Sequence, residues 1–158
     1  MAVQTLDSKV GTGTSYNVDH IRPRPFTIVG EDHLNEAYAD LATRLMSIGN
    51  LSNLYLEAFR EGRIERDYYH SRARDMDEMR QAGEDPSKYI KIVDEALKRG
   101  LIVHGIDRDD PYERRKPEHV SRWADYILSN AFGNSLILVG SYHALYSLPP
   151  DLSDRPNQ

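Results

Sequence analysis

The chain has 158 residues, a formal net charge of -5 at pH 7 and no cysteine. This length fits one domain and is short for two of ordinary size. Without cysteine, disulfides, cysteine-ligated zinc and thiol catalysis are excluded, and the acidic charge argues against a nucleic-acid partner. The first ten residues lack the apolar run of a secretory signal, so we expect a soluble, cytoplasmic protein without a membrane partner.

Residues 1–30 are expected to form an extended N-terminal arm. Pro23 and Pro25 lack an amide hydrogen and favour extended geometry at the residue before each of them. The β-prone residues 26–29 could pair with residues 101–103 as one short two-stranded element. Because an irregular apolar arm gains stability only on another surface, we expect it to bind a protein partner or a second copy of the chain. The residues expected at such an interface are Tyr16, Ile21, Arg22, Arg24, Phe26, Tyr68 and Tyr69.

A seven-residue repeat of apolar side chains predicts a long helix over residues 32–60. The acidic residues at its start suit the positive end of the helix dipole, and Gly62 is a candidate cap at its end. Gly49 interrupts the repeat, which leaves a kink, a break into two helices or a close helix contact open there. The repeat consists of Leu34, Tyr38, Leu41, Leu45, Ile48, Tyr55 and Phe59.

Three further helices are predicted after Gly62. Residues 64–82 carry one narrow apolar stripe on a charge-rich background, and residues 87–98 end in a favourable Lys-Arg-Gly sequence. The last helix begins near Pro117, a favoured first-turn residue. The apolar residues 135–140 fit helix or strand by periodicity, and we favour helix because a helical pattern continues after them.

These elements together predict a mostly α fold. The expected architecture is a small bundle of four to five helices with an extended N-terminal arm and one short two-stranded β element at most. The corresponding domain division is an arm over residues 1–30, a helical domain over 31–148 and a polar C-terminal tail over 149–158.

Asp67 and His70 are weak candidate metal ligands. Residues three apart share a helix face, but di-iron bundles use Glu-x-x-His twice, and this chain has a single Asp-x-x-His. It also has no HExxH sequence. An ordinary surface pair on a charge-rich helix is the favoured interpretation, so no metal or other cofactor is expected.

No catalytic constellation stands out, because dinucleotide, phosphate-loop and nucleophile-elbow motifs are all missing from the sequence. The ten tyrosines suit boundary positions and protein interfaces. We therefore expect a non-catalytic helical interaction or assembly protein, a subunit of a homo- or hetero-oligomer. Two alternatives remain open. One is a small helical enzyme or ligand-binding domain, with or without a metal, whose pocket holds Asp67, His70, His143 and nearby tyrosines. The other is a small regulator that binds and inhibits another protein.

Overall fold

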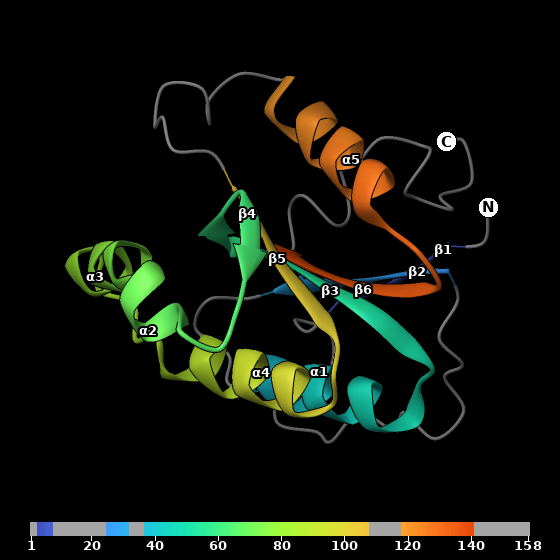
Figure 1. Cartoon of the computed structure of the whole chain (residues 1–158), viewed down its shortest axis with the longest axis horizontal. Helices are drawn as coiled ribbons and strands as arrows, with labels where there is room; N and C mark the ends of the chain where they lie inside the picture. The colour runs from blue at the N-terminus through green and yellow to red at the C-terminus, as the bar shows by residue number, and fades with distance from the viewer. Residues whose placement is uncertain (1–2, 8–24, 32–36, 108–117, 141–158) are drawn as a thin grey trace.

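A computed structural model of the chain describes residues 3–7, 25–31, 37–107 and 118–140. These residues form a six-stranded mixed sheet with helices on both of its faces (Figure 1). The elements in chain order are β1 (Val3–Asp7), β2 (Phe26–Glu31), α1 (Ala37–Ile48), β3 (Leu51–Arg60), β4 (Gly62–Ile64), α2 (Tyr68–Ser71), α3 (Ala73–Gln81), α4 (Ser87–Lys98), β5 (Ile102–Asp107), α5 (Glu118–Asn130) and β6 (Asn134–Gly140).

The strands lie in the order β1-β2-β6-β3-β5-β4. The first five are parallel to one another, and β4 runs antiparallel to β5 at the edge. Helices α1 and α4 cover one face of the sheet and α5 covers the other (Figure 1). Parallel strands covered on both faces are typically continuous apolar runs, and residues 135–139 in the middle of β6 are all buried.

The predicted mostly α bundle is therefore wrong, and the expected long helix shows why. Helix α1 ends at Ile48, Gly49 and Asn50 turn the chain, and the second half of the predicted helix is the ten-residue strand β3. A strand that is buried on both faces has apolar residues at most positions, so some of them match a helical repeat by coincidence. Tyr55 packs on the α5 side of the sheet and Phe59 on the α1 side, whereas a helix would have placed both on one face.

The residues for which we favoured a helix at 135–140 form β6, which is a second error of the same kind. The predicted helix over residues 64–82 is instead the end of β4 followed by the short helices α2 and α3. Of the expected N-terminal arm, residues 3–7 and 26–30 lie in the strands β1 and β2 of the sheet, and residues 8–24 lie outside the described residues.

Two predicted helices are confirmed, since α4 spans the expected residues 87–98 and α5 begins beside Pro117. Residues 26–29 and 101–103 do contribute to strands, but β2 and β5 are not neighbours in the sheet. Within the described ranges, no helix combines the length and the apolar character needed to cross a bilayer.

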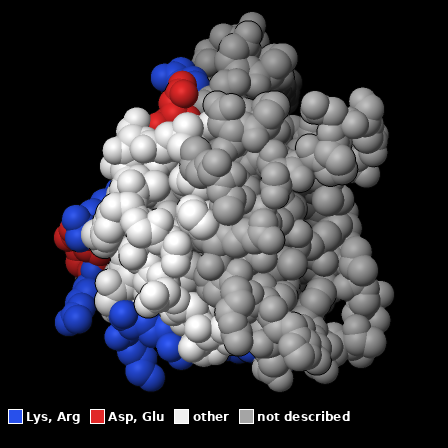
Figure 2. Space-filling view, turned by 90° about the vertical axis from the view of Figure 1, so that its right-hand side faces the viewer, with Lys and Arg blue, Asp and Glu red and all other residues white. Residues whose placement is uncertain are grey.

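The turns that lead into β3 and β6 lie next to each other, on the right-hand side of Figure 1. The Asn134 side chain donates a hydrogen bond of 3.2 Å to the carbonyl oxygen of Asn50, which joins the two turns. Figure 2 looks onto this side of the molecule, and the charged side chains among its described residues lie at the margins.

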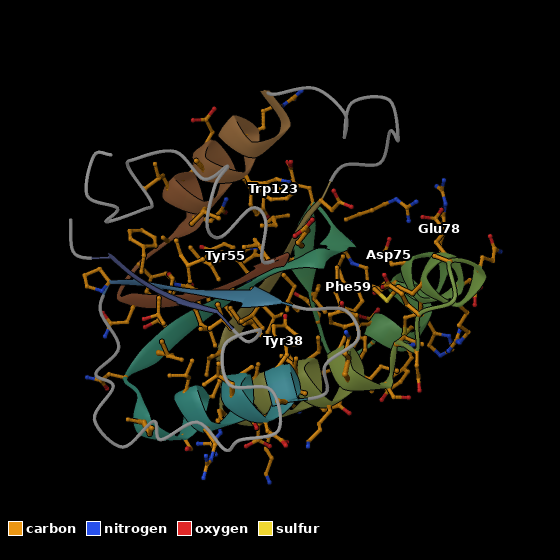
Figure 3. The ribbon with its side chains drawn as sticks, turned by 180° about the vertical axis from the view of Figure 1, so that it is seen from behind. Tyr38, Tyr55, Phe59, Asp75, Glu78 and Trp123 are labelled. Carbon is orange, nitrogen blue, oxygen red and sulfur yellow. The ribbon has the colours of Figure 1, made fainter. Side chains whose placement is uncertain are left out.

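The core between the sheet and the helices α1 and α4 is centred on aromatic rings. Tyr89 of α4 meets both Tyr38 of α1 and Phe59 of β3 edge to face, with ring centroids 6.4 Å apart in each pair. All three rings are fully buried, and Figure 3 shows Tyr38 between α1 and the sheet. These contacts fix the two helices on the same face of the sheet.

Gly105 permits a close approach between β3 and β5. The pairing register of these strands shifts between Leu56 and Arg60, which is a bulge in β3. A Cβ atom at position 105 would lie 2.0 Å from the carbonyl oxygen of Arg60 and 2.6 Å from that of Phe59. Any larger residue would therefore push the carboxyl end of β3 away from β5.

Candidate functional site

A row of polar side chains crosses the face of the sheet that α5 covers. Because strand side chains alternate, Asn53, Tyr55 and Glu57 of β3 lie on one face, the face on which Tyr55 packs with Trp123. Figure 3 shows Tyr55 and Trp123 between the sheet and α5. Polar groups in such a layer cost free energy unless they are hydrogen-bonded. The polar row consists of Asn53, Tyr55 and Glu57 of β3, His104 of β5 and Tyr126 of α5.

Glu57 lies near the carboxyl end of β3 and is partly buried. Its Oε2 atom accepts a hydrogen bond of 2.6 Å from the backbone N–H of Gly140, the last residue of β6. Gly140 is in turn the register partner of Glu31, the last residue of β2. Hydrogen bonds to a carboxylate are shorter and stronger than those between neutral groups. One fixed carboxylate therefore lies where the carboxyl ends of β3, β6 and β2 come together.

This edge is also where the chain leaves neighbouring strands toward opposite faces of the sheet. The connection from β3 leads through β4, α2 and α3 to α4, on the same face as α1. The connection from β5 leads to α5 on the other face. In open α/β sheets, ligands bind at the carboxyl ends of the strands beside such a switch point.

His104 is buried, with 5% of its surface exposed, and its ring stacks on that of Tyr55 with centroids 5.1 Å apart. Its Nδ1 atom lies 2.8 Å from the hydroxyl oxygen of Tyr126. Burial lowers the pKa of His104 below 6.5, and the positive charge of Arg63 lowers it further. The imidazole is therefore neutral at physiological pH, and one of its nitrogens is a hydrogen-bond acceptor.

The two tyrosines of the polar row stay protonated at neutral pH. Burial raises the pKa of Tyr55 to about 12, with a smaller contribution from Tyr126. Burial also raises the pKa of Tyr126, and the charge of Glu61 adds to this effect. The Tyr55 hydroxyl is buried and has no hydrogen-bond partner among the described residues. A buried hydroxyl without a partner costs about 1–3 kcal/mol, and in native proteins such a group generally has a specific reason.

Asn53, at the other end of the row, has a structural role. Its Nδ2 atom donates to the carbonyl oxygen of Phe132 at 2.6 Å and to Oγ of Ser135 at 3.2 Å. These bonds hold the turn between α5 and β6 on the sheet. The chemistry is therefore expected at the Glu57 end of the row.

A separate charged cluster joins α3 to the end of β3, and its charges are paired with each other. The Arg60 guanidinium binds Asp75 and both carboxylate oxygens of Glu78, the latter at 2.6 Å. Arg72 donates to the carbonyl oxygens of Arg60 at 2.7 Å and Arg63 at 3.1 Å. Figure 3 shows Asp75 and Glu78 side by side on α3. This pairing indicates that the cluster fixes the turn between β3 and β4.

Among the described residues, the structure brings together only some of the site residues that the sequence suggested: the rings of Tyr68 and Tyr69 stack with centroids 4.4 Å apart. Asp67 and His70 are exposed at the start of α2, and the described residues contain no group of three or more metal-ligating side chains. Phe26 is buried on the α5 side of the sheet and Tyr68 on the opposite side, where it donates to Asp94 at 2.6 Å. Tyr69 is half exposed. Outside the described residues lie Tyr16, Ile21, Arg22, Arg24 and His143.

The three residues of the polar row that lie on β3 were missed because β3 was predicted to be part of a helix. A signal was present, since Asn53, Tyr55 and Glu57 alternate with Leu54 and Leu56 at the two-residue period of a strand. No family model, curated protein or solved structure matches the chain, so the functional proposal rests on its own residues.

Proposed function

We propose that the chain binds a small polar ligand at the carboxyl ends of β2, β6 and β3, and that it acts on this ligand by acid–base chemistry. The observation that carries the proposal is the hydrogen bond of 2.6 Å between Glu57 Oε2 and the Gly140 N–H. It holds a carboxylate at the edge where parallel sheets take their ligands. A carboxylate recognises hydroxyl, amine or amidine groups, so the ligand carries at least one such donor.

The polar groups beside Glu57 support proton transfer. Burial holds His104 in its neutral form, so one of its ring nitrogens is an acceptor for a hydrogen bond or a proton. The phenols of Tyr55 and Tyr126 keep their protons and are available as donors. The imidazole, the two phenols and the Glu57 carboxylate therefore lie on one face of the sheet.

The rival proposal, a non-catalytic subunit of an assembly, is favoured by one specific observation. Phe132 is the most exposed large apolar side chain among the described residues, at 54%. An exposed aromatic residue suits a protein interface, and such a surface is compatible with a ligand site at the opposite end of the strands.

The ligand site is tested by thermal unfolding in the presence of a library of small polar compounds. A ligand at about 100 times its Kd stabilises a protein by about 2.7 kcal/mol. For a chain of this length that corresponds to a rise in Tm of about 5–10 °C. At least one hydroxyl- or amine-bearing compound is expected to raise the Tm of the wild type in this way.

Glu57→Gln is the decisive variant, because its amide oxygen still accepts the hydrogen bond from Gly140 while the negative charge is lost. The variant is expected to fold and to lose the response to the compound. Glu95→Gln is the matched control, since Glu95 pairs with Arg99 on the exposed side of α4 and lies outside the polar row. An equal response of Glu57→Gln and wild type, or a library without any stabilising compound, would refute the proposal.

A further inference from the structure

Within the described residues, α5 is the one helix that covers its face of the sheet (Figure 1). On the other face, α1 and α4 contact both the sheet and each other, since the rings of Tyr38 and Tyr89 pack edge to face. The described buried residues of α5 are Trp123, Ala124 and Ile127, which pack against the sheet. Elements with fewer buried apolar contacts open at a lower free energy than the rest of a fold. Of these three helices, α5 is therefore expected to separate from the sheet most easily.

The turn after α5 is fixed to the sheet and forms a pivot for the helix. The buried Asn53 side chain of β3 donates a hydrogen bond of 2.6 Å to the carbonyl oxygen of Phe132. Gly133 has a φ of +59°, and a Cβ atom there would lie 2.4 Å from Oγ of Ser52. Because this turn is bound to β3 and leads directly into β6, α5 can leave the sheet while the strands stay paired.

His104 lies beneath α5, with two tyrosine rings against it. It is 5% exposed, and its Nδ1 atom lies 2.8 Å from the hydroxyl oxygen of Tyr126 on α5. Its ring stacks on Tyr55 and meets the Tyr126 ring edge to face, with centroids 5.5 Å apart in the second pair. Both phenols are uncharged at neutral pH, so neither would supply a negative charge to an imidazolium at this position.

The charged groups on the two neighbouring strands do not stabilise a protonated His104. Burial lowers the pKa of His104 below 6.5, and the positive charge of Arg63, its register partner on β4, lowers it further. Glu57 lies on the same face of β3, but its carboxylate bonds to Gly140 of β6, on the side of β3 away from β5. The imidazole is therefore buried beside a cation and apart from this carboxylate.

The charges on the β3–β4 turn and on the described part of α5 occur with both signs. Glu61 raises the pKa of Tyr126, after the larger effect of burial, and Arg72 lowers it. The side chains of Arg122 and Asp125 on α5 are exposed. An imidazolium beneath α5 would therefore carry a desolvation cost that these groups do not offset.

We propose that α5 is a pH-sensitive cover of the polar row, and that protonation of His104 favours a state in which α5 has swung away from the sheet about the turn at residues 131–133. Water solvates the imidazolium in this open state, whereas the closed state buries it. Opening takes up one proton, so the opening constant rises by up to about tenfold for each pH unit below 6.5, until His104 titrates in the closed state as well. The opening requires no ligand at Glu57 and is therefore independent of the proposed ligand site.

Native-state hydrogen exchange of the full chain between about pH 7 and about pH 5 tests the proposal. After correction for intrinsic exchange rates, the opening constant of the α5 amides is expected to rise by at least about tenfold over this range. It is also expected to exceed the opening constant of the α4 amides at each pH, because α4 is fixed by α1 as well as by the sheet.

Three variants show whether His104 is the group that titrates. His104→Gln is expected to remove the pH dependence of α5 opening, whereas His70→Gln, which changes an exposed histidine on α2, is expected to keep it. Tyr126→Phe removes the hydrogen bond to Nδ1 but leaves the imidazole in place. This variant is expected to open more at both pH values and to retain the pH dependence.

An NMR titration of the wild type measures the pKa of His104 in the folded chain, whatever the stability of the His104→Gln variant. A pKa below 6.5 is expected. A pKa at or above 6.5, or equal opening constants for the α5 and α4 amides, would overturn the proposal. A folded His104→Gln variant whose α5 opening keeps the pH dependence of the wild type would overturn it as well.

Discussion

The Nδ1 atom of His104 lies 2.8 Å from the hydroxyl oxygen of Tyr126, which links β5 to α5 across the polar layer of the protein. The imidazole also stacks on Tyr55, so three side chains from three elements form one contact group. Burial favours the neutral forms of all three side chains. The protonation states of these three side chains therefore depend on the packing of α5 against the sheet.

His104 is predicted to make stability depend on pH below about 6.5. The unfolded chain binds a proton at the ordinary pKa of 6.5, and the folded chain binds it only at a lower pH. The free energy of unfolding therefore falls as the pH drops below 6.5 and levels off below the folded pKa. Urea unfolding at a series of pH values measures this slope, which is expected to decrease in His104→Gln.

His70→Gln is the control for this series, because His70 is exposed on α2. It is expected to retain the pH dependence of the wild type. An unchanged slope in His104→Gln would show that His104 titrates at its ordinary pKa and is not buried as described.

Tyr55→Phe is predicted to stabilise the protein. The variant removes a buried hydroxyl that has no hydrogen-bond partner among the described residues. Its removal is expected to raise the free energy of unfolding by about 1 kcal/mol or more. Tyr68→Phe is the matched control. Its free energy of unfolding is expected to fall by about 1 kcal/mol, because the Tyr68 hydroxyl donates a hydrogen bond to Asp94. Thermal unfolding measures both. A destabilised Tyr55→Phe variant would indicate that the hydroxyl has a partner.

Asp75→Ala is predicted to lower the free energy of unfolding by about 3 kcal/mol, because it removes the buried carboxylate that pairs with Arg60 and leaves the more exposed carboxylate of Glu78. The Asp75 side chain is 6% exposed and also lies 3.5 Å from Arg72. Glu78→Gln is expected to cost about 1 kcal/mol or less, since Glu78 is 41% exposed. Equal losses of stability in the two variants, measured by denaturant unfolding, would contradict this ranking.

Leu45→Ala is predicted to cost about 2–5 kcal/mol, because Leu45 is buried between α1 and the sheet and the change leaves a cavity. Arg44→Ala, one residue earlier on the exposed side of α1, is expected to stay within about 0.5 kcal/mol of the wild type. Urea unfolding of the wild type and the two variants measures these changes in the free energy of unfolding. A near-neutral Leu45→Ala variant would show that α1 does not pack as described.

The amphipathic elements of this fold could be read from the sequence, and the buried ones could not. Helix α4 has one apolar face and clear end signals, so its bounds were predicted correctly. Strands β3 and β6 lie in the middle of the sheet and are covered on both faces. The run at residues 136–139 of β6 is apolar throughout and carries little information about its period, whereas β3 alternates at residues 53–57 but also places apolar residues at positions that match a helical repeat.

The candidate site could not be predicted because it depends on the order of the strands. Glu57 and Gly140 are 83 residues apart, and only the placement of β6 beside β3 brings them together. His104 and Tyr126 meet because α5 crosses the face of β5. No motif of fixed spacing records either contact, whereas Asp67 and His70 share a local spacing and belong to no group of three metal-ligating side chains within the described residues.

The affinity of Glu57→Gln for a ligand of the wild type tests the central claim most directly. Isothermal titration calorimetry would compare the two proteins with the compound that gives the largest thermal shift, together with the Glu95→Gln control. The loss of the carboxylate that Gly140 holds is predicted to weaken binding by at least about tenfold, or 1.4 kcal/mol, with unchanged folding. Equal affinity in wild type and Glu57→Gln would contradict a ligand site at the carboxyl ends of β2, β6 and β3.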